Sequence, residues 1–246
     1  MNWEEILNKL ETGELRSANK IDGKWESNKE VKKGILEAFK AGQLEQLGDF
    51  VDKHNIPARR FSPADGIRIV PGGSSVRRGS YVAKGVIIMP PAYVNIGAFI
   101  DEGTMVDSHA LVGSCAQIGK RVHLSAGVQI GGVLEPIGQS PVVIEDDSFI
   151  GAGSVIVEGI QVKKGAIIAP GVTLSNAVPV YDCINEKLLG RGEPIPENAV
   201  VVPGSRPIND KHIWGKEKNL QMNCAIIIKY RDNNSDASVE LEEFLR

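Results

Sequence analysis

The chain has 246 residues, of which 42% are hydrophobic, 24% are charged and only 5% are aromatic, and its net charge is −3 at pH 7. This balance indicates a globular protein with one large domain, or one domain and a small appendage, and gives no reason to expect nucleic acid or an anionic membrane as a partner. The three cysteines (Cys115, Cys183 and Cys224) are too few and too far apart for a disulfide framework or a zinc site, which favours a reduced, cytoplasmic protein without a metal.

The first 66 residues are predicted to form a small helical domain. Apolar residues recur at helical spacing in the segments 3–15 and 28–42, and Gly13 and Gly42 can end the two helices. Between them the Asp-Gly pair of KIDGKW predicts a turn, and ARRFSPADG predicts a polar linker. The N-terminal segment lacks the apolar run of a signal peptide, and no stretch approaches the roughly 18 apolar residues of a membrane span. We therefore expect no membrane association.

From residue 70 onward, an aliphatic residue recurs at every sixth position. The series runs from Val70 to Ile130 without a break and resumes from Ile144 to Val180. If aliphatic residues fill about a quarter of positions, ten successive hits would arise by chance about once in a million. A period of six matches neither a helix nor a single strand, but it suits a parallel β-helix whose three short faces take one hexapeptide each. The series predicts that these side chains point inward: Val82, Ile88, Val94, Ile100, Val106, Val112 and Ile118.

Four further features complete the prediction for the coil, which we place at residues 67–182, and for its two ends. The gap between Ile130 and Ile144 is two residues out of register, so GGVLEPIGQSPVV is predicted to be an inserted loop. Because a solenoid has open ends, we expect the N-terminal helices to cap one end. In residues 183–246, NAVVVPG and CAIIIKY are predicted to form strands and VELEEFLR a closing helix. Sharp corners are expected at the fourth position of the repeats, where several glycines stand, among them Gly85, Gly97, Gly103, Gly153 and Gly165.

Four segments of the chain are specific enough to compare with a known family: KIDGKW, RIVPGGSSVRRGSYVAKGVIIMPPAYVNIGAFIDEGTMVD, VGSCAQIGKRVHLSAGVQIGGVLEP and VVIEDDSFIGAGSVIVEG. They closely resemble the tetrahydrodipicolinate N-succinyltransferase family of hexapeptide-repeat acyltransferases. The resemblance covers nearly the whole chain and is most specific over residues 68–147. It implies a mainly β fold with a left-handed parallel β-helix, a homotrimer, and transfer of the succinyl group of succinyl-CoA to the amine of L-tetrahydrodipicolinate in the diaminopimelate route to lysine. It implies no permanently bound cofactor, because succinyl-CoA is a co-substrate.

Asp107 and Arg68 are the strongest candidates for substrate contact. Asp107 follows the inward Val106 and, from the sequence alone, could equally be a turn-forming residue. In the resembled family the aspartate of MVD contacts the substrate, where a carboxylate can orient the amine and accept its proton as the amine attacks the thioester. Arg68 would by itself be taken as a surface residue. The matching arginine of the family grips a substrate carboxylate, which a guanidinium binds through two hydrogen bonds.

His109, His123 and Ser114 receive weaker assignments. No two of the four histidines are five residues apart, the spacing that γ-class carbonic anhydrases use for a metal, so we predict no metal site. His123 lies in a segment shared with the family, which favours a structural or hydrogen-bonding role over catalysis. His109 stands where the family often has a tryptophan beside the substrate, so we expect it to line the pocket. We expect Ser114 to donate a hydrogen bond near the substrate and Cys115 to pack within a rung.

The acyl-CoA is expected to bind in a groove between two subunits, because a coil with a filled core offers no internal pocket. Gly131 and Gly132 would allow close approach of the backbone, and the inserted loop would overhang the groove and exclude water. Lys163 and Lys164 could meet the phosphates of CoA, although a solvated surface position is as well supported by the sequence.

Two departures from the family bear on the acyl group and on the base. Gly153 and Val155 stand where the family often has an arginine and a glutamate, and this glutamate approaches the substrate amine in some members. Its loss makes Asp107 the better candidate for the base. The uncharged Val155 also favours N-acetyl transfer to the same acceptor, whereas KIDGKW and the C-terminal segment favour succinyl transfer. The sequence is compatible, in addition, with acyl transfer to a different amine and with a non-catalytic β-helix scaffold.

Overall fold

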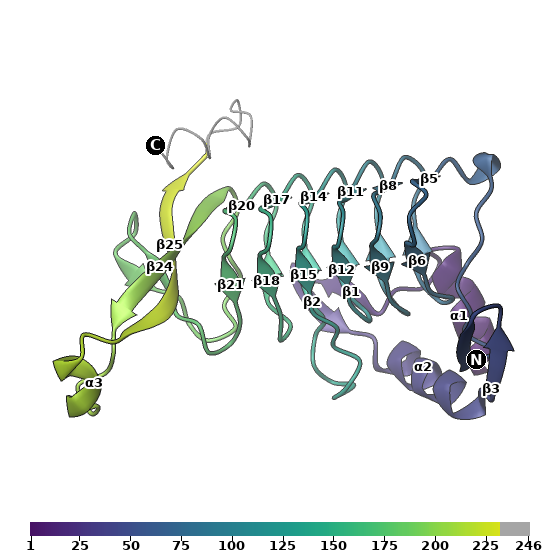
Figure 1. Cartoon of the computed structure of the whole chain (residues 1–246), viewed down its shortest axis with the longest axis horizontal. Coiled ribbons are helices and arrows are strands. Elements are labelled where there is room, and N and C mark those ends of the chain that lie inside the picture. Colours follow the sequence, from purple (N-terminus) through teal and green to yellow (C-terminus); the bar gives the residue numbers. More distant parts are fainter. Residues whose placement is uncertain (232–246) are drawn as a thin grey trace.

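A computed structural model describes residues 1–231, and the predicted closing helix VELEEFLR lies outside them. A long left-handed parallel β-helix forms the body of the chain, and an antiparallel ribbon lies at its C-terminal end (Figure 1). The helices α1 and α2 lie at the other end, where they pack on the side of the first turns, against Ile96 and Cys115. Each turn of the coil contributes one two-residue strand to each of three faces, and each strand pairs in parallel with the strand one turn away. The six-residue period therefore predicted the correct fold.

The chain visits the three faces of the coil in a fixed order, from the first to the third. The first face consists of β5 (Arg68–Ile69), β8 (Ile87–Ile88), β11 (Met105–Val106), β14 (His123–Leu124), β17 (Phe149–Ile150) and β20 (Ile167–Ile168). The second face consists of β6 (Ser75–Val76), β9 (Tyr93–Val94), β12 (Leu111–Val112), β15 (Gln129–Ile130), β18 (Val155–Ile156) and β21 (Thr173–Leu174). The third face consists of β7 (Tyr81–Val82), β10 (Phe99–Ile100), β13 (Gln117–Ile118), β16 (Val143–Ile144) and β19 (Gln161–Val162).

The core of the coil is a column of aliphatic side chains, as the repeat predicted. Val82 is 5% exposed, and the other six residues predicted to point inward are completely buried. The five predicted corner glycines all have positive φ, between 68° and 83°, a conformation that side chains with a Cβ rarely adopt. Stacked rings of aliphatic residues explain why the coil needs so few aromatic residues.

The predicted series was wrong at both of its ends. Ile69, not Val70, pairs with Ile88, because the corner that follows β5 holds one extra residue. Gly72 and Gly73, with φ of 143° and 92°, give this wider corner its shape. At the other end, Val180 belongs to β22, which pairs with the C-terminal strand β25 instead of continuing a face. Ile195 takes the place above Val162 through an isolated parallel bridge.

Residues 131–142 form the predicted loop and contain no helix or strand. The loop packs against the N-terminal region, where the fully buried Lys32 donates a hydrogen bond from Nζ to the Gln139 carbonyl at 2.7 Å. Ser27 Oγ donates to the Ile137 carbonyl at 2.8 Å, and Leu134 packs on the apolar cluster formed by the N-terminal helices. The loop is thus anchored within its own chain. Its predicted position over a groove between subunits remains a prediction.

The N-terminal region contains the two predicted helices, but it is not purely helical. The elements are α1 (Trp3–Glu11), β1 (Ala18–Ile21), β2 (Lys24–Ser27), α2 (Lys29–Ala41), β3 (Leu44–Leu47), β4 (Phe50–Lys53) and the 3₁₀ turn η1 (Pro63–Asp65). The predicted turn in KIDGKW joins β1 and β2, and Asp22 and Gly23 both have the positive φ of a type I′ hairpin. The two hairpins are mostly exposed and bury no regular apolar face, so the sequence carried no alternating pattern that would predict them.

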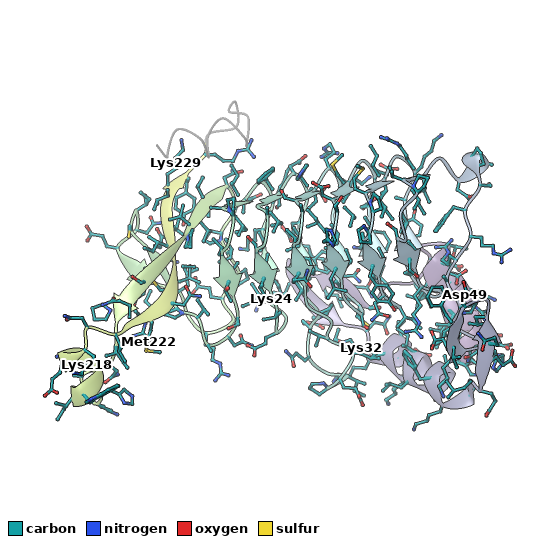
Figure 2. All side chains as sticks on the ribbon, in the orientation of Figure 1. Lys24, Lys32, Asp49, Lys218, Met222 and Lys229 are labelled. Atoms are coloured by element: carbon teal, nitrogen blue, oxygen red, sulfur yellow. The ribbon has the colours of Figure 1, made fainter. Side chains whose placement is uncertain are left out.

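The C-terminal end of the coil is covered by a long antiparallel ribbon. It comprises β22 (Val180–Asp182), β23 (Lys187–Leu188), β24 (Ala199–Pro207), α3 (Ile213–Glu217) and β25 (Gln221–Tyr230). The predicted strands in NAVVVPG and CAIIIKY are therefore confirmed. Pairing of Val201 with Ile168 joins β24 to the first face, and Lys218 and Met222 mark the distant tip of the ribbon beside α3 (Figure 2). Within residues 1–231, no helix has the length and apolar character needed to cross a membrane.

Candidate active site

Asp107 lies at the corner between the first and second faces, directly after β11. Its side chain is half-buried, and Oδ1 accepts a hydrogen bond from the Ser108 backbone N–H at 2.7 Å. This local bond orients the carboxylate and leaves Oδ2 able to accept a proton or a further hydrogen bond. His109, at the same corner, is exposed and has φ of 62°, and its backbone N–H donates to the Pro91 carbonyl at 2.6 Å.

His123 lies near Asp107, on the outer side of the first face. It opposes Met105 in the pairing of β11 with β14, and its ring stacks on Phe149 with centroids 5.0 Å apart. Burial lowers the pKa of His123, and the nearby Asp107 carboxylate only partly opposes this effect. The imidazole is therefore neutral near pH 7, which suits a packing and hydrogen-bonding group beside the carboxylate.

The lowered pKa of His123 predicts a loss of stability in mild acid. Below the ordinary histidine pKa of about 6.5, the unfolded chain binds a proton that the folded chain resists, so the free energy of unfolding falls as the pH drops toward the folded pKa. The His123→Gln variant should lose less stability on acidification than the parent chain. Thermal unfolding at about pH 7.5 and about pH 5.5 measures the difference. Equal losses in the two proteins would show that His123 makes no such contribution.

Arg68 lies on β5, at the end of the first face nearest the N-terminal helices. It is exposed and stands two rungs from Met105, or about 10 Å along the stack of strands. Arg68, Arg59 and Phe61 line a cavity of about 480 Å³. It therefore shares the Asp107 side of the coil and can reach one end of an extended substrate held there.

Arg59 is a residue that the sequence interpretation missed. Its guanidinium lies 4.9 Å from the centroid of the Phe61 ring, and Nη1 donates to the Ser80 carbonyl at 2.6 Å. Burial lowers its pKa, and Glu11, with an oxygen 3.9 Å away, partly offsets this. In the sequence, Arg59 lies in the segment ARRFSPADG, whose polar composition predicted only a linker.

Ser114, Gly131 and Gly132 lie together at the corner between the second and third faces. Ser114 is half-buried, and its carbonyl accepts a hydrogen bond from the Val133 N–H at 3.0 Å. A Cβ on Gly132 would lie 2.7 Å from the Ser114 nitrogen, and one on Gly131 would lie 2.8 Å from Val157 Cγ1. These glycines therefore let the loop leave the coil close to neighbouring rungs, a reason independent of CoA. Their contact with CoA remains a prediction.

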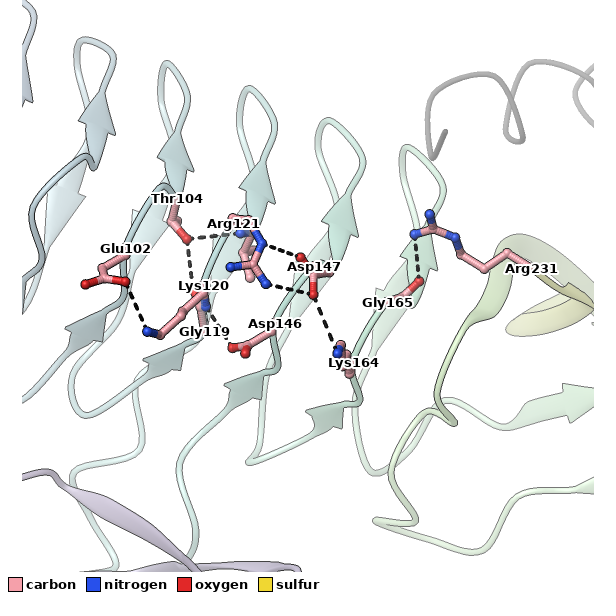
Figure 3. Close-up of polar contacts among 11 residues, drawn as sticks. Glu102, Thr104, Gly119, Lys120, Arg121, Asp146, Asp147, Lys164, Gly165 and Arg231 are labelled. Carbon is pink, nitrogen blue, oxygen red and sulfur yellow. Dashed lines mark hydrogen bonds and ion pairs between the residues drawn. The ribbon is translucent and has the colours of Figure 1, made fainter. Parts of the chain in front are cut away.

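Lys163 and Lys164 lie at the corner between the third and first faces. Both are exposed, and Lys164 Nζ is 3.9 Å from Asp147 Oδ2. Asp147 also accepts two hydrogen bonds from Arg121, at 2.6 and 3.0 Å, so charges of opposite sign alternate along this corner (Figure 3). Lys164 is thus part of an ion-pair network, whereas Lys163 has no carboxylate within 4.0 Å in residues 1–231 and interacts only at longer range with Glu193. Phosphate binding by either lysine remains a prediction.

Apart from Arg68, which lies on the first face, the predicted site residues therefore occupy three different corners of one chain. Arg68, Asp107 and His109 share one side of the coil, whereas Ser114 and the loop glycines lie at the second corner and the two lysines at the third. A filled aliphatic column separates the corners, so one coil cannot bring all of these side chains to one ligand. Among residues 1–231, no group of three or more His, Cys, Asp or Glu side chains is arranged to hold a metal ion.

Several known proteins match this chain along nearly its entire length. Residues 3–41 match the family described as tetrahydrodipicolinate N-succinyltransferase N-terminal, and residues 141–176 match the bacterial transferase hexapeptide family. A 2,3,4,5-tetrahydropyridine-2,6-dicarboxylate N-succinyltransferase from Coxiella burnetii is 45% identical, over 98% of this chain and 88% of the relative. The enzyme of the same name from Acinetobacter baylyi is 46% identical, over 99% of this chain and 88% of the relative.

A solved structure supports the fold independently. A candidate 2,3,4,5-tetrahydropyridine-2-carboxylate N-succinyltransferase from Campylobacter jejuni superposes with a TM-score of 0.57 at 20% identity, covering 92% of this chain and 63% of that one. At this identity the likeness concerns the fold alone, while the curated relatives establish kinship. The chain belongs to the tetrahydrodipicolinate N-succinyltransferase family of hexapeptide-repeat transferases.

Proposed function

We propose that this chain transfers the succinyl group of succinyl-CoA to the amino group that L-tetrahydrodipicolinate presents in its open form, 2-amino-6-oxopimelate. The products are N-succinyl-2-amino-6-oxopimelate and free CoA. The observation that carries this proposal is the identity of 43–46% with enzymes named for this reaction, over 98–99% of the chain. The reaction belongs to the diaminopimelate route to lysine, and it requires no resident cofactor.

The chemistry assigns a distinct task to Asp107. The neutral amine attacks the thioester carbonyl, the C–N bond forms, the C–S bond breaks, and the electron pair leaves on the CoA sulfur. The attacking nitrogen must lose a proton, and the thiolate must gain one. The oriented, half-buried Asp107 carboxylate can hold the amine and accept its proton through Oδ2. Arg68, on the same side of the coil, would bind a carboxylate of the acceptor.

The spread of candidate residues over three corners supports a site shared between subunits. If three coils pack in parallel, the corner of one chain that carries Asp107 can face the corner of another that carries Ser114 and the inserted loop. The groove between them would hold the extended pantetheine arm of CoA, and Lys163 or Lys164 would meet its phosphates. A homotrimer is the assembly proposed here, in accordance with the resemblance to the family.

A CoA-release assay with two donors tests this proposal. With L-tetrahydrodipicolinate as the acceptor, kcat/KM should be at least tenfold higher with succinyl-CoA than with acetyl-CoA, because a terminal carboxylate bound by even one charged partner contributes about 1.5–3 kcal/mol. A preference for acetyl-CoA would instead identify the chain as an N-acetyltransferase. Absence of acceptor-dependent release with either donor, in a protein that still binds CoA, would contradict both assignments.

A further inference from the structure

A second cavity lies apart from the corner that carries Asp107. It has a volume of about 280 Å³ and opens where the β1–β2 hairpin meets the third face and the corner that follows it. Small-molecule sites have volumes of roughly 300–1,000 Å³, so a cavity of this size suits a metabolite no larger than an amino acid. Its lining combines Trp25 with several charged side chains, of which Arg16, Asp101, Asp146 and Glu197 are considered below.

Arg16 supplies a cation that lacks a carboxylate partner within residues 1–231. Its guanidinium lies 3.6 Å from the centroid of the Phe99 ring and 5.3 Å from that of Trp25, and Nε donates to Gln117 Oε1 at 2.9 Å. In the described part of the chain, no carboxylate oxygen comes within 4.0 Å of it. Burial lowers the pKa of Arg16, and Asp101 and Asp146 only partly offset this effect. A bound anion would therefore stabilise the charged guanidinium.

Three carboxylates on the same lining also lack a cation at contact distance within residues 1–231. Asp101 Oδ1 accepts from the Glu102 backbone N–H, and Asp146 Oδ1 accepts from that of Lys120, both at 2.8 Å. Figure 3 shows Asp146 in this position at the edge of the coil. Asp101 and Asp146 are thus oriented by the backbone, and in residues 1–231 the second oxygen of each accepts no hydrogen bond. Glu197 is exposed and likewise makes no side-chain hydrogen bond within these residues.

The remaining charges of the cavity already have partners. Lys20 Nζ contacts Glu145 Oε1 at 2.6 Å, and Trp25 Nε1 donates to the same oxygen at 2.9 Å. These contacts hold the hairpin against the coil, and the three side chains line one side of the cavity. Lys164 also lines the cavity, and its Nζ lies 3.9 Å from Asp147, a residue outside the lining. The lining groups without an opposite charge within 4.0 Å in residues 1–231 are one guanidinium and three carboxylates, a net of −2. Lys164 offsets part of this negative charge, because it shares Asp147 with Arg121.

We propose that this cavity binds a basic α-amino acid, a molecule with one carboxylate and two ammonium groups. The ligand carboxylate would pair with Arg16, and its ammonium groups would pair with Asp101, Asp146 and Glu197. Such a ligand would bridge the β1–β2 hairpin and the coil. Neither an aliphatic amino acid, which lacks the second ammonium, nor a diamine, which lacks the carboxylate, would satisfy both ends of the cavity.

Calorimetric titration of the full chain tests this proposal with three probes of similar length. L-Lysine should bind at least tenfold more tightly than norleucine, which lacks the side-chain ammonium, and than cadaverine, which lacks the carboxylate. Binding of L-lysine should be unchanged in Asp107→Asn, because that residue lies at a different corner. The result is independent of catalysis, so failure of the proposed function would not affect it. No binding of L-lysine, or equal affinity for L-lysine and norleucine, would overturn the proposal.

Variants of the carboxylates locate the site. Asp101→Asn keeps the acceptor for the Glu102 N–H and removes the charge, and combined with Glu197→Gln it should weaken L-lysine binding about tenfold or more. Glu26→Gln is the matched control, since Glu26 is exposed and points to the face of the hairpin opposite Trp25. Arg16 also packs on Phe99, so the carboxylates provide the cleaner test. Unchanged affinity in a double variant with the parent melting temperature would place the ligand elsewhere.

Discussion

Replacing Asp107 by asparagine is expected to lower kcat by about 10²–10⁴-fold, the range typical of a positioned general base. Asparagine keeps the shape of the side chain and can still accept the hydrogen bond from the Ser108 N–H, so the corner should keep its conformation. The amide has neither the charge that orients the amine nor the basicity that removes its proton. Steady-state rates with saturating acceptor and donor measure the effect, and CoA binding by the variant should be unchanged.

His109→Asn is the matched control for Asp107→Asn. It changes a neighbouring polar residue at the same corner, and asparagine tolerates the positive φ of 62° at this position. Its effect on kcat should be much smaller, because His109 is exposed and the resembled family commonly lacks a histidine there. If His109→Asn abolished turnover while Asp107→Asn left it intact, the base would be the histidine, and the assignment would be reversed.

Replacing Arg68 by alanine is expected to raise KM for the dicarboxylate acceptor about tenfold to a hundredfold and to leave KM for the acyl-CoA nearly unchanged. A charge-assisted contact between guanidinium and carboxylate contributes about 1.5–3 kcal/mol, which corresponds to this range of affinity. Arg68 is exposed in the chain, so its removal should cost little stability, and a loss of acceptor affinity can be attributed to binding. Initial rates over a range of acceptor concentrations provide the measurement.

Arg60→Ala serves as the control for Arg68→Ala. Arg60 is another exposed arginine, located in the segment that leads into the coil, and the proposed mechanism gives it no role. It should leave both KM values unchanged. An unchanged acceptor KM in Arg68→Ala would show that Arg68 is an ordinary surface residue and that another group, with Arg59 as the nearest candidate, holds the acceptor carboxylate.

The coil was predictable from sequence because its physics is local and repeated. Each inward aliphatic residue stacks on its equivalents one turn away, so the requirement recurs at every sixth position and leaves a long series. The prediction failed where the contacts are not repeated. An extra residue after Ile69 shifts the first rung, and pairing of Val180 with Ala225 on β25 removes the last one from the coil. A strand partner 45 residues away leaves no signal in a six-residue pattern.

The candidate site was predictable in its residue types but not in its spatial arrangement. Spacing places Asp107 at a corner because it follows the inward Val106, but it does not indicate which corner Ser114 or Lys164 occupies relative to it. Nor does spacing show that His123 lies beside Asp107, since 16 residues and one full turn of the coil separate them. Side chains that meet across turns depend on the fold as a whole, and only the structure reveals them.

Transfer of a labelled acyl group tests the central assignment most directly. The chain is incubated with L-tetrahydrodipicolinate and succinyl-CoA labelled in the succinyl group, and the products are analysed by mass spectrometry. The assignment predicts one labelled succinyl group in amide linkage to the acceptor nitrogen for each CoA released, and a loss of this product in Asp107→Asn. Release of CoA with the label recovered only as free succinate, or an acceptor modified from acetyl-CoA but not from succinyl-CoA, would contradict it.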